Sequence, residues 1–145
     1  MEIAGSIDIK ASRDTVGALL SNPEKVVECV PGIQSYELSG NEFKSKIKVK
    51  IGMISGTFKV EGKIEEIKKN EEYRVFLKGR SMGNSFDATA DISLSDAGEG
   101  VTRLDYRANA KLSGMLAALG KGIVENVTKT LLDEMFQCIE KKAIA

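Results

Sequence analysis

Residues 43–64, FKSKIKVKIGMISGTFKVEGKI, decide the fold of this chain. From Phe43 to Ile51 the odd positions are Phe, Ser, Ile, Val and Ile, whereas the even positions are all lysine. One apolar and one charged face with a period of two is typical of an antiparallel strand that covers a core. After a tight connection at Gly52 and Met53, the alternation resumes from 54 to 64. We therefore predict two consecutive antiparallel strands.

The same alternation recurs elsewhere, at residues 3–9, 73–79, 86–94 and 104–112. The apolar phase slips by one at 65–67, which predicts a β-bulge or a strand end there. Polar turns at 68–71 and 96–100 separate neighbouring strands. The spacing predicts an antiparallel meander.

Helical patterns flank the meander. Ser12 is a favourable N-cap and Pro23 fits a first turn, so we expect short helices over about 12–20 and 22–30. Apolar residues recur at intervals of three and four residues from about Met115 to Lys141, which predicts a helix roughly 40 Å long. Three glycines interrupt the start of this helix, and we expect them to form a mobile gate: Gly114, Gly120 and Gly122.

The sheet must curl around the long helix, because one long and two short helices cannot cover a flat sheet. Gly5, Gly56, Gly62 and Gly79 fall on the inward face, where glycine eases coiling and close approach. Inward alanines leave two alternatives open: close helix packing, or a cavity for a ligand. The residues expected to line that cavity are Phe58, Val60, Tyr73, Val75, Leu77, Phe86, Ala88, Ala90, Tyr106, Ala108, Met115, Leu116, Leu119 and Ile123. The hydroxyls of Tyr73 and Tyr106 need a partner, which is a ligand carbonyl, a backbone carbonyl or water.

Composition excludes several kinds of chemistry. The 145 residues suffice for one domain, 1–145, and carry 21 basic and 21 acidic side chains but no histidine. Histidine-dependent triads and His–zinc sites are therefore excluded, and a basic excess for nucleic acid is missing. Asp87 and Asp91 lie too far apart along a strand to act as a catalytic carboxylate pair. We expect a noncatalytic protein without a metal or a resident cofactor.

Two features keep alternatives open. Cys29 and Cys138 lie near opposite ends of the chain without CxxC spacing, and both free buried thiols and a long-range disulfide are compatible with this. The lysines at 44, 46, 48 and 50 could meet anionic lipid or an acidic partner, or could protect a sheet edge from pairing. No aromatic residues interleave with them, which argues against single-stranded nucleic acid.

The order of elements resembles the helix-grip fold of the START/Bet v 1-like superfamily, and the motifs resemble the CoxG family of carbon monoxide dehydrogenase subunits. The resemblance covers nearly the whole chain. It rests on residues 22–24 and 29–32 followed by a polar loop, on Gly52 with 56–58, on 100–106, and on SGMLAALG at 113–120. It implies an α+β fold with a curled seven-stranded antiparallel sheet around a long C-terminal helix and two short helices after strand 1.

The resemblance also implies a function. A cavity between sheet and helix would hold a hydrophobic small molecule, quinone- or lipid-like. The partners would be other subunits or maturation factors of a carbon monoxide dehydrogenase. The role of this chain would be in the maturation of that enzyme, in its recruitment to the membrane or in electron delivery. An enzyme of the cyclase or hydrolase type on the same fold and a pure protein-interaction module are the alternatives.

The expected location is the cytoplasm, with peripheral contact at the inner face of the membrane as a further option. The first eight residues lack the pattern of a signal peptide, and no apolar tract reaches the ~20 residues that span a bilayer. Many relatives continue into a hydrophobic anchor after the long helix, whereas this sequence ends at Ala145, so we expect no anchor in this chain.

Overall fold

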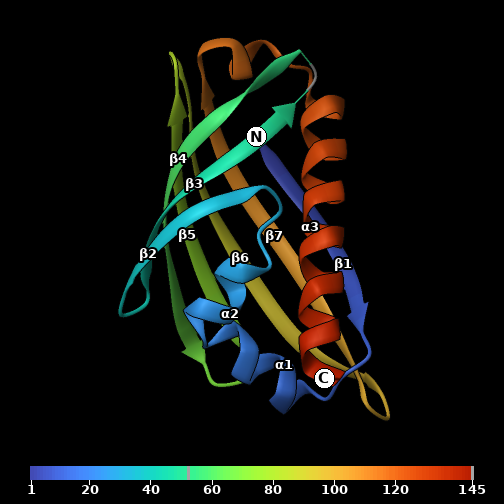
Figure 1. Cartoon of the computed structure of the whole chain (residues 1–145). Helices are drawn as coiled ribbons and strands as arrows, with labels where there is room; N and C mark the ends of the chain where they lie inside the picture. Colours follow the sequence, from blue (N-terminus) through green and yellow to red (C-terminus); the bar gives the residue numbers. More distant parts are fainter. Residues whose placement is uncertain (52, 145) are drawn as a thin grey trace.

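A curved antiparallel sheet wraps around one long helix in the computed structural model, which describes residues 1–51 and 53–144 (Figure 1). Its seven strands within these residues are β1 (Glu2–Ile9), β2 (Ile33–Ser39), β3 (Glu42–Ile51), β4 (Ile54–Lys68), β5 (Glu72–Ser81), β6 (Asn84–Gly98) and β7 (Val101–Ser113). The helices are α1 (Arg13–Leu20), α2 (Pro23–Glu28), the short 3-10 helix η1 (Gly114–Ala118) and α3 (Lys121–Ile144). The strand order is β1-β7-β6-β5-β4-β3-β2, so the meander is confirmed.

Two boundaries differ from the sequence prediction. The residues after Gly32, expected to form a polar loop, form strand β2 and pair with β3. The long helix begins at Lys121 rather than near Met115, because Gly114 has a positive φ of 73° and Leu119 is extended. The bulge is confirmed as a register shift between Glu66 and Lys68. The tight connection predicted at 52–53 falls partly on residue 52, which lies outside the described residues.

The core is divided into two clusters of apolar side chains. The lower cluster joins α1, α2 and the C-terminal half of α3 to the sheet, around Ile9, Val16, Leu104 and Ile139. The upper cluster joins β3 and β4 to α2 and η1. Its buried members are Val27, Phe43, Ile47, Ile54, Phe58, Val60 and Leu116.

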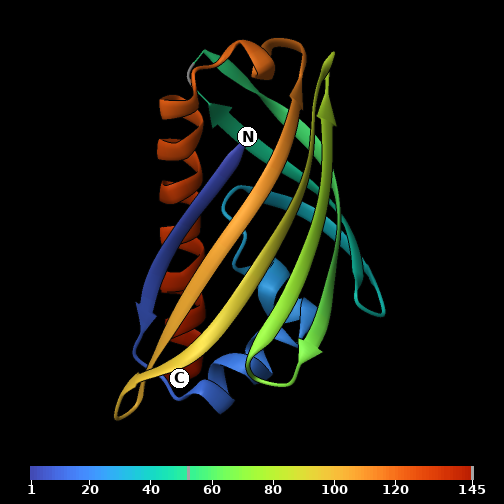
Figure 2. The same cartoon turned by 180° about the vertical axis from the view of Figure 1, so that it is seen from behind.

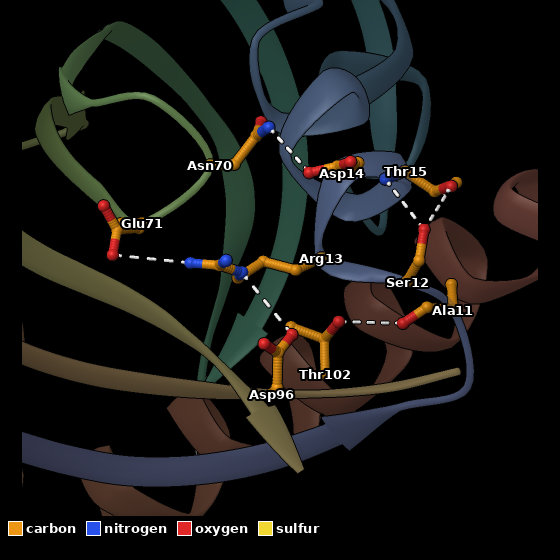
Figure 3. A network of polar contacts seen from close by, with 9 residues as sticks. All are labelled: Ala11, Ser12, Arg13, Asp14, Thr15, Asn70, Glu71, Asp96 and Thr102. Atoms are coloured by element: carbon orange, nitrogen blue, oxygen red, sulfur yellow. Dashed lines mark hydrogen bonds and ion pairs between the residues drawn. The ribbon is translucent and has the colours of Figure 1, made fainter. Parts of the chain in front are cut away.

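A polar network fixes α1 to the lower end of the sheet (Figure 3). Ser12 caps the helix by accepting a hydrogen bond from the backbone N–H of Thr15 at 3.2 Å. The buried Thr102 hydroxyl donates to the carbonyl of Ala11 at 2.8 Å. Arg13 lies 3.4 Å from Glu71, and its other ion pair, with Asp96, measures 3.5 Å. These contacts connect α1 and the residues just before it with β6, β7 and the β4–β5 turn.

Three of the inward glycines make room for an aromatic ring from the adjacent strand. Each lies directly opposite an aromatic residue whose ring covers it: Gly5 opposite Tyr106, Gly62 opposite Phe43, and Gly79 opposite Phe86. A side chain in place of the hydrogen would collide with the ring. The glycines therefore make room for aromatic rings on a crowded concave face.

We expect Gly62→Ala to lower the free energy of unfolding by about 1–3 kcal/mol, as overpacking of a filled site does. The added methyl would overlap the Phe43 ring and lie 2.9 Å from Cδ2 of Leu77. Gly56→Ala on the same strand is the matched control, because its methyl would meet only the Ser81 hydroxyl, at 3.5 Å. Denaturant unfolding measures both variants, and an equal effect would contradict this packing role.

A disulfide joins Cys29, at the C-terminal end of α2, to Cys138 in α3. The Cα atoms are 5.5 Å apart, within the range that a disulfide bridges. Of the two alternatives that the sequence left open, the free thiols are wrong. The two cysteines are 109 positions apart in the sequence, and the cross-link between them lies in the lower cluster.

Candidate functional site

The two core clusters leave between them a band of apolar side chains that are only partly buried, which we call the central strip. From the sheet it contains Val75, Ala88, Ala90, Ala108 and Ala110, and from the N-terminal half of α3 it contains Val124, Val127 and Leu131. None of these residues belongs to either cluster. Apolar side chains on an inner face normally become fully buried, and here they keep contact with solvent.

Four alanines form the middle of the central strip. Ala88 lies directly opposite Ala110, and Ala90 directly opposite Ala108, on the adjacent strands β6 and β7. Helix α3 makes its main backbone contacts with β1 and α1 and a smaller one with β3, so it approaches the two sides of the sheet more closely than the central strands. The alanines therefore favour an open surface rather than close helix packing.

The residues predicted to line a cavity separate into three groups. Half-buried and facing inward are Val75, Leu77, Phe86, Ala88, Ala90, Tyr106, Ala108 and Leu119. Fully buried within the clusters are Phe58, Val60, Tyr73 and Leu116, so their side chains are held by protein neighbours. Met115 and Ile123 are exposed, at 62% and 46% of their surface. The structure thus brings the first group to the central strip and its margins.

The two inward tyrosines differ in their surroundings. Tyr73 is 1% exposed and its hydroxyl donates to the carbonyl of Gly17 at 3.3 Å, so the backbone is its partner. The hydroxyl of Tyr106 has no hydrogen-bond partner among the described residues. Burial, and to a smaller extent the nearby carboxylate of Asp133, raises the pKa of Tyr106. This phenol therefore stays protonated at neutral pH and can donate a hydrogen bond to a ligand.

The segment expected to act as a gate is fixed in its first half. The side-chain oxygen of Asn84 accepts a hydrogen bond from the backbone N–H of Leu116 at 3.2 Å, and Leu116 itself is buried. Gly114 packs against the carbonyl of Gly83, where no larger residue fits. Residues 119–122 follow this anchored part, and a side chain at either Gly120 or Gly122 would meet open space.

Several residues of this candidate site were not predicted from the sequence. Val124, Val127 and Leu131 fit the predicted helical period, but only the position of α3 relative to the sheet shows which face they present. Asn84 follows a turn and carries no pattern that would mark it. Its place next to Gly83 in the turn was the one available signal.

The acidic pair considered as a catalytic group, Asp87 and Asp91, lies on the outer face of the sheet. Asp91 pairs with Arg74 at 2.8 Å, and Asp87 lies 3.9 Å from Lys78. Hydrogen bonds from Ser6 and Arg103 lower the pKa of Asp105, which is also an outer residue. Within residues 1–51 and 53–144, no group of three or more acidic or cysteine side chains could hold a metal ion.

The lysines of β3 do not all protect a sheet edge. Strand β2 pairs with β3 from Glu42 to Ile47, and the carbonyl of Gly32 accepts from the backbone N–H of Lys48. Lys44 and Lys46 therefore lie inside the sheet, and edge protection is the wrong interpretation for them. No helix in the described part of the chain is long and apolar enough to cross a membrane.

Comparison with known proteins places this geometry in context. The family model of CoxG, a carbon monoxide dehydrogenase component, matches residues 5–144. No curated protein sequence matches the chain. A conserved protein from Geobacillus kaustophilus superposes with a TM-score of 0.91 at 25% identity, over 99% of this chain and 95% of that one.

Two more distant solved structures share the fold alone. A START superfamily protein from Mycobacterium smegmatis has a TM-score of 0.69 at 14% identity, over 98% of this chain and 96% of that chain. Ara h 8.0201 has a TM-score of 0.67 at 17% identity, over 99% of this chain and 97% of that chain. The seven-stranded sheet around a long C-terminal helix is therefore a START/Bet v 1-like fold.

Proposed function

We propose, since this chain belongs to the CoxG family of carbon monoxide dehydrogenase subunits, that it binds a hydrophobic small molecule on the central strip and releases it unchanged. The START/Bet v 1-like fold is consistent with hydrophobic ligand binding in general. The finer proposal is a quinone- or lipid-like molecule held between β5, β6, β7 and the N-terminal half of α3.

The observation that carries this proposal is the central strip itself. Its alanine block sits between two packed clusters, so the chain leaves apolar surface in contact with water at the middle of its concave face. Covering such surface with an apolar ligand gains about 25 cal/mol for each Å² removed from water. The Tyr106 hydroxyl offers one hydrogen-bond donor to a polar group on the ligand.

The side chains at the central strip suit a carrier better than an enzyme. A protonated phenol with a raised pKa is a poor general base at neutral pH. The histidines that usually perform proton transfer are absent from the sequence. We propose that the chain delivers its ligand to, or matures, a carbon monoxide dehydrogenase in the cytoplasm, and the family description is the support for that role.

Native mass spectrometry of the purified protein tests the proposal. We expect an adduct that organic extraction removes and that re-forms with a quinone or a long-chain lipid. Extraction followed by lipid analysis identifies its class. A protein that carries no adduct and takes up neither kind of molecule would leave the protein-interaction alternative in its place.

Ligand exchange should slow when the start of α3 is stiffened. Gly120 and Gly122 have ordinary negative φ and open space around them, so Gly120→Ala/Gly122→Ala introduces no clash. Gly122 lies inside the helix, where alanine is favoured by about 1 kcal/mol, and Gly120 lies just before it. We expect slower dissociation of a fluorescent hydrophobic ligand with little change in affinity. Equal rates in variant and wild type would remove residues 119–122 from the exchange path.

A further inference from the structure

Charges alternate in sign across most of the outer face of the sheet. One row of directly opposed residues runs across six strands as Glu37, Lys44, Glu61, Lys78, Asp87 and Lys111. A second row runs Glu65, Arg74, Asp91 and Arg107. Opposite charges at facing positions stabilise neighbouring strands, so this arrangement is explained by the sheet alone.

One row breaks this rule, and we call it the basic row. Lys46 of β3 lies directly opposite Lys59 of β4, which lies directly opposite Arg80 of β5. The row continues into Ser35 and Ser85, and no acidic residue stands in it. None of the three cations forms an ion pair with another described residue. Facing like charges destabilise a sheet, so stability does not account for this row.

The lysines continue from the basic row toward the end of the molecule that holds η1 and the start of α3, which we call the upper end (Figure 1). Lys48 and Lys50 occupy the next outward positions of β3 and face Thr57 and Ser55. The formal charge of the chain is zero, so this cationic surface is a local concentration rather than a property of the whole chain. It extends from the middle of β3 and β4 toward the end of the molecule where β3, β5 and β7 finish (Figure 1).

Exposed methionines stand at three tips of this same end. Met53 lies between β3 and β4 and is 96% exposed, and Met82 lies between β5 and β6 and is 98% exposed. Met115 in η1 is 62% exposed. Both views show these three connections and the start of α3 together at one end (Figures 1 and 2). The turns at the opposite end, 69–71 and 99–100, are polar or glycine.

We propose that the upper end of the molecule docks on the surface of an anionic lipid bilayer, with Met53 and Met82 entering the headgroup boundary and the basic row facing the lipid phosphates. Apolar tips next to Lys and Arg are what binding at a membrane interface requires. An acidic protein would neutralise the basic row but would leave the methionine tips unexplained. The proposal goes beyond ligand binding and does not depend on it.

Vesicle cosedimentation tests the charge requirement. We expect the wild type to bind phosphatidylcholine vesicles that contain phosphatidylserine and not those without it. Lys46→Gln/Lys59→Gln/Arg80→Gln should weaken binding about a hundredfold, since each cation near an anionic surface contributes to the affinity. The matched control is Lys25→Gln/Lys69→Gln/Lys141→Gln. It removes the same charge from α2, the β4–β5 turn and the last turns of α3, and should keep wild-type binding.

Tryptophan fluorescence tests the orientation, because the chain contains no tryptophan. We expect the emission of Met82→Trp to shift to shorter wavelength with the anionic vesicles, whereas Glu99→Trp at the opposite end should not shift. Both positions are exposed, so neither variant disturbs the core.

Three results would overturn the proposal. They are equal loss of binding in the two triple variants, equal spectral shifts at both ends, and binding to polyglutamate without binding to vesicles. The last result would assign the basic row to an acidic macromolecule. Since native mass spectrometry without vesicles measures ligand binding separately, failure of docking is distinguishable from failure of the proposed function.

Discussion

Ala108→Phe should abolish retention of the apolar ligand while the protein still folds. Ala108 lies opposite Ala90 in the central strip and is only partly buried, so a phenyl ring there would occupy the surface that the ligand needs. Overpacking a filled core costs about 1–3 kcal/mol, and the cost should be smaller where the ring enters a space open to solvent. Native mass spectrometry and the affinity of a fluorescent hydrophobic ligand measure the loss.

Asn109→Phe is the matched control for this variant. Asn109 is the next residue of β7, and it points to the outer face and is exposed. Ala90→Trp should repeat the loss from the facing strand. If Ala108→Phe and Ala90→Trp both retained wild-type affinity with wild-type thermal stability, the ligand would bind elsewhere and the central strip would have no part in the function.

Loss of the Cys29–Cys138 disulfide should cause the largest change in stability. A cross-link that closes 109 residues restricts the unfolded chain, and the loop-entropy relation gives about 4.7 kcal/mol for a loop of this size. Measured values for native disulfides are commonly about 2–5 kcal/mol. We expect Cys29→Ala/Cys138→Ala to lower the free energy of unfolding by an amount in this range.

Reduction of the wild type provides the control. The reduced wild type and the double variant should unfold at similar denaturant concentrations, and the oxidised wild type at a clearly higher one. The double variant itself should not respond to reductant. An unchanged unfolding midpoint of the wild type under reducing conditions would show that the cross-link contributes nothing to stability.

Much of the fold could be predicted because its strands alternate cleanly between one buried and one solvated face. Strand β2 was missed because a bulge between Ile33 and Ser35 puts Ile33 out of phase with Tyr36 and Leu38, so no period of two is visible in the sequence. The start of α3 was placed too early because the apolar residues of 115–119 keep a helical spacing. Only the backbone angles of Gly114 and Leu119 reveal the break.

The residue types of the candidate site could be predicted from the sequence, whereas their contacts could not. Inward alanines follow from the period of two, and Ala88, Ala90 and Ala108 do lie at the central strip. The partner of Tyr73 could not be known, because Gly17 lies 56 residues away and meets it only through the packing of α1. Register across strands depends on turn geometry, and the rings that cover Gly62 and Gly79 depend on that register.

Helix α3 is attached like a beam fixed at one end. Near its C-terminus, Cys138 is bonded to Cys29, Lys142 lies 2.8 Å from Glu28, and Glu140 accepts from the backbone of Lys10. Its first ten residues contain no fully buried side chain. The deflection of a beam grows with distance from its clamp, so a small tilt at the fixed end becomes a large displacement at Lys121. For the proposed ligand, we therefore expect the start of α3 to adapt to molecules of different width without any change in the sheet.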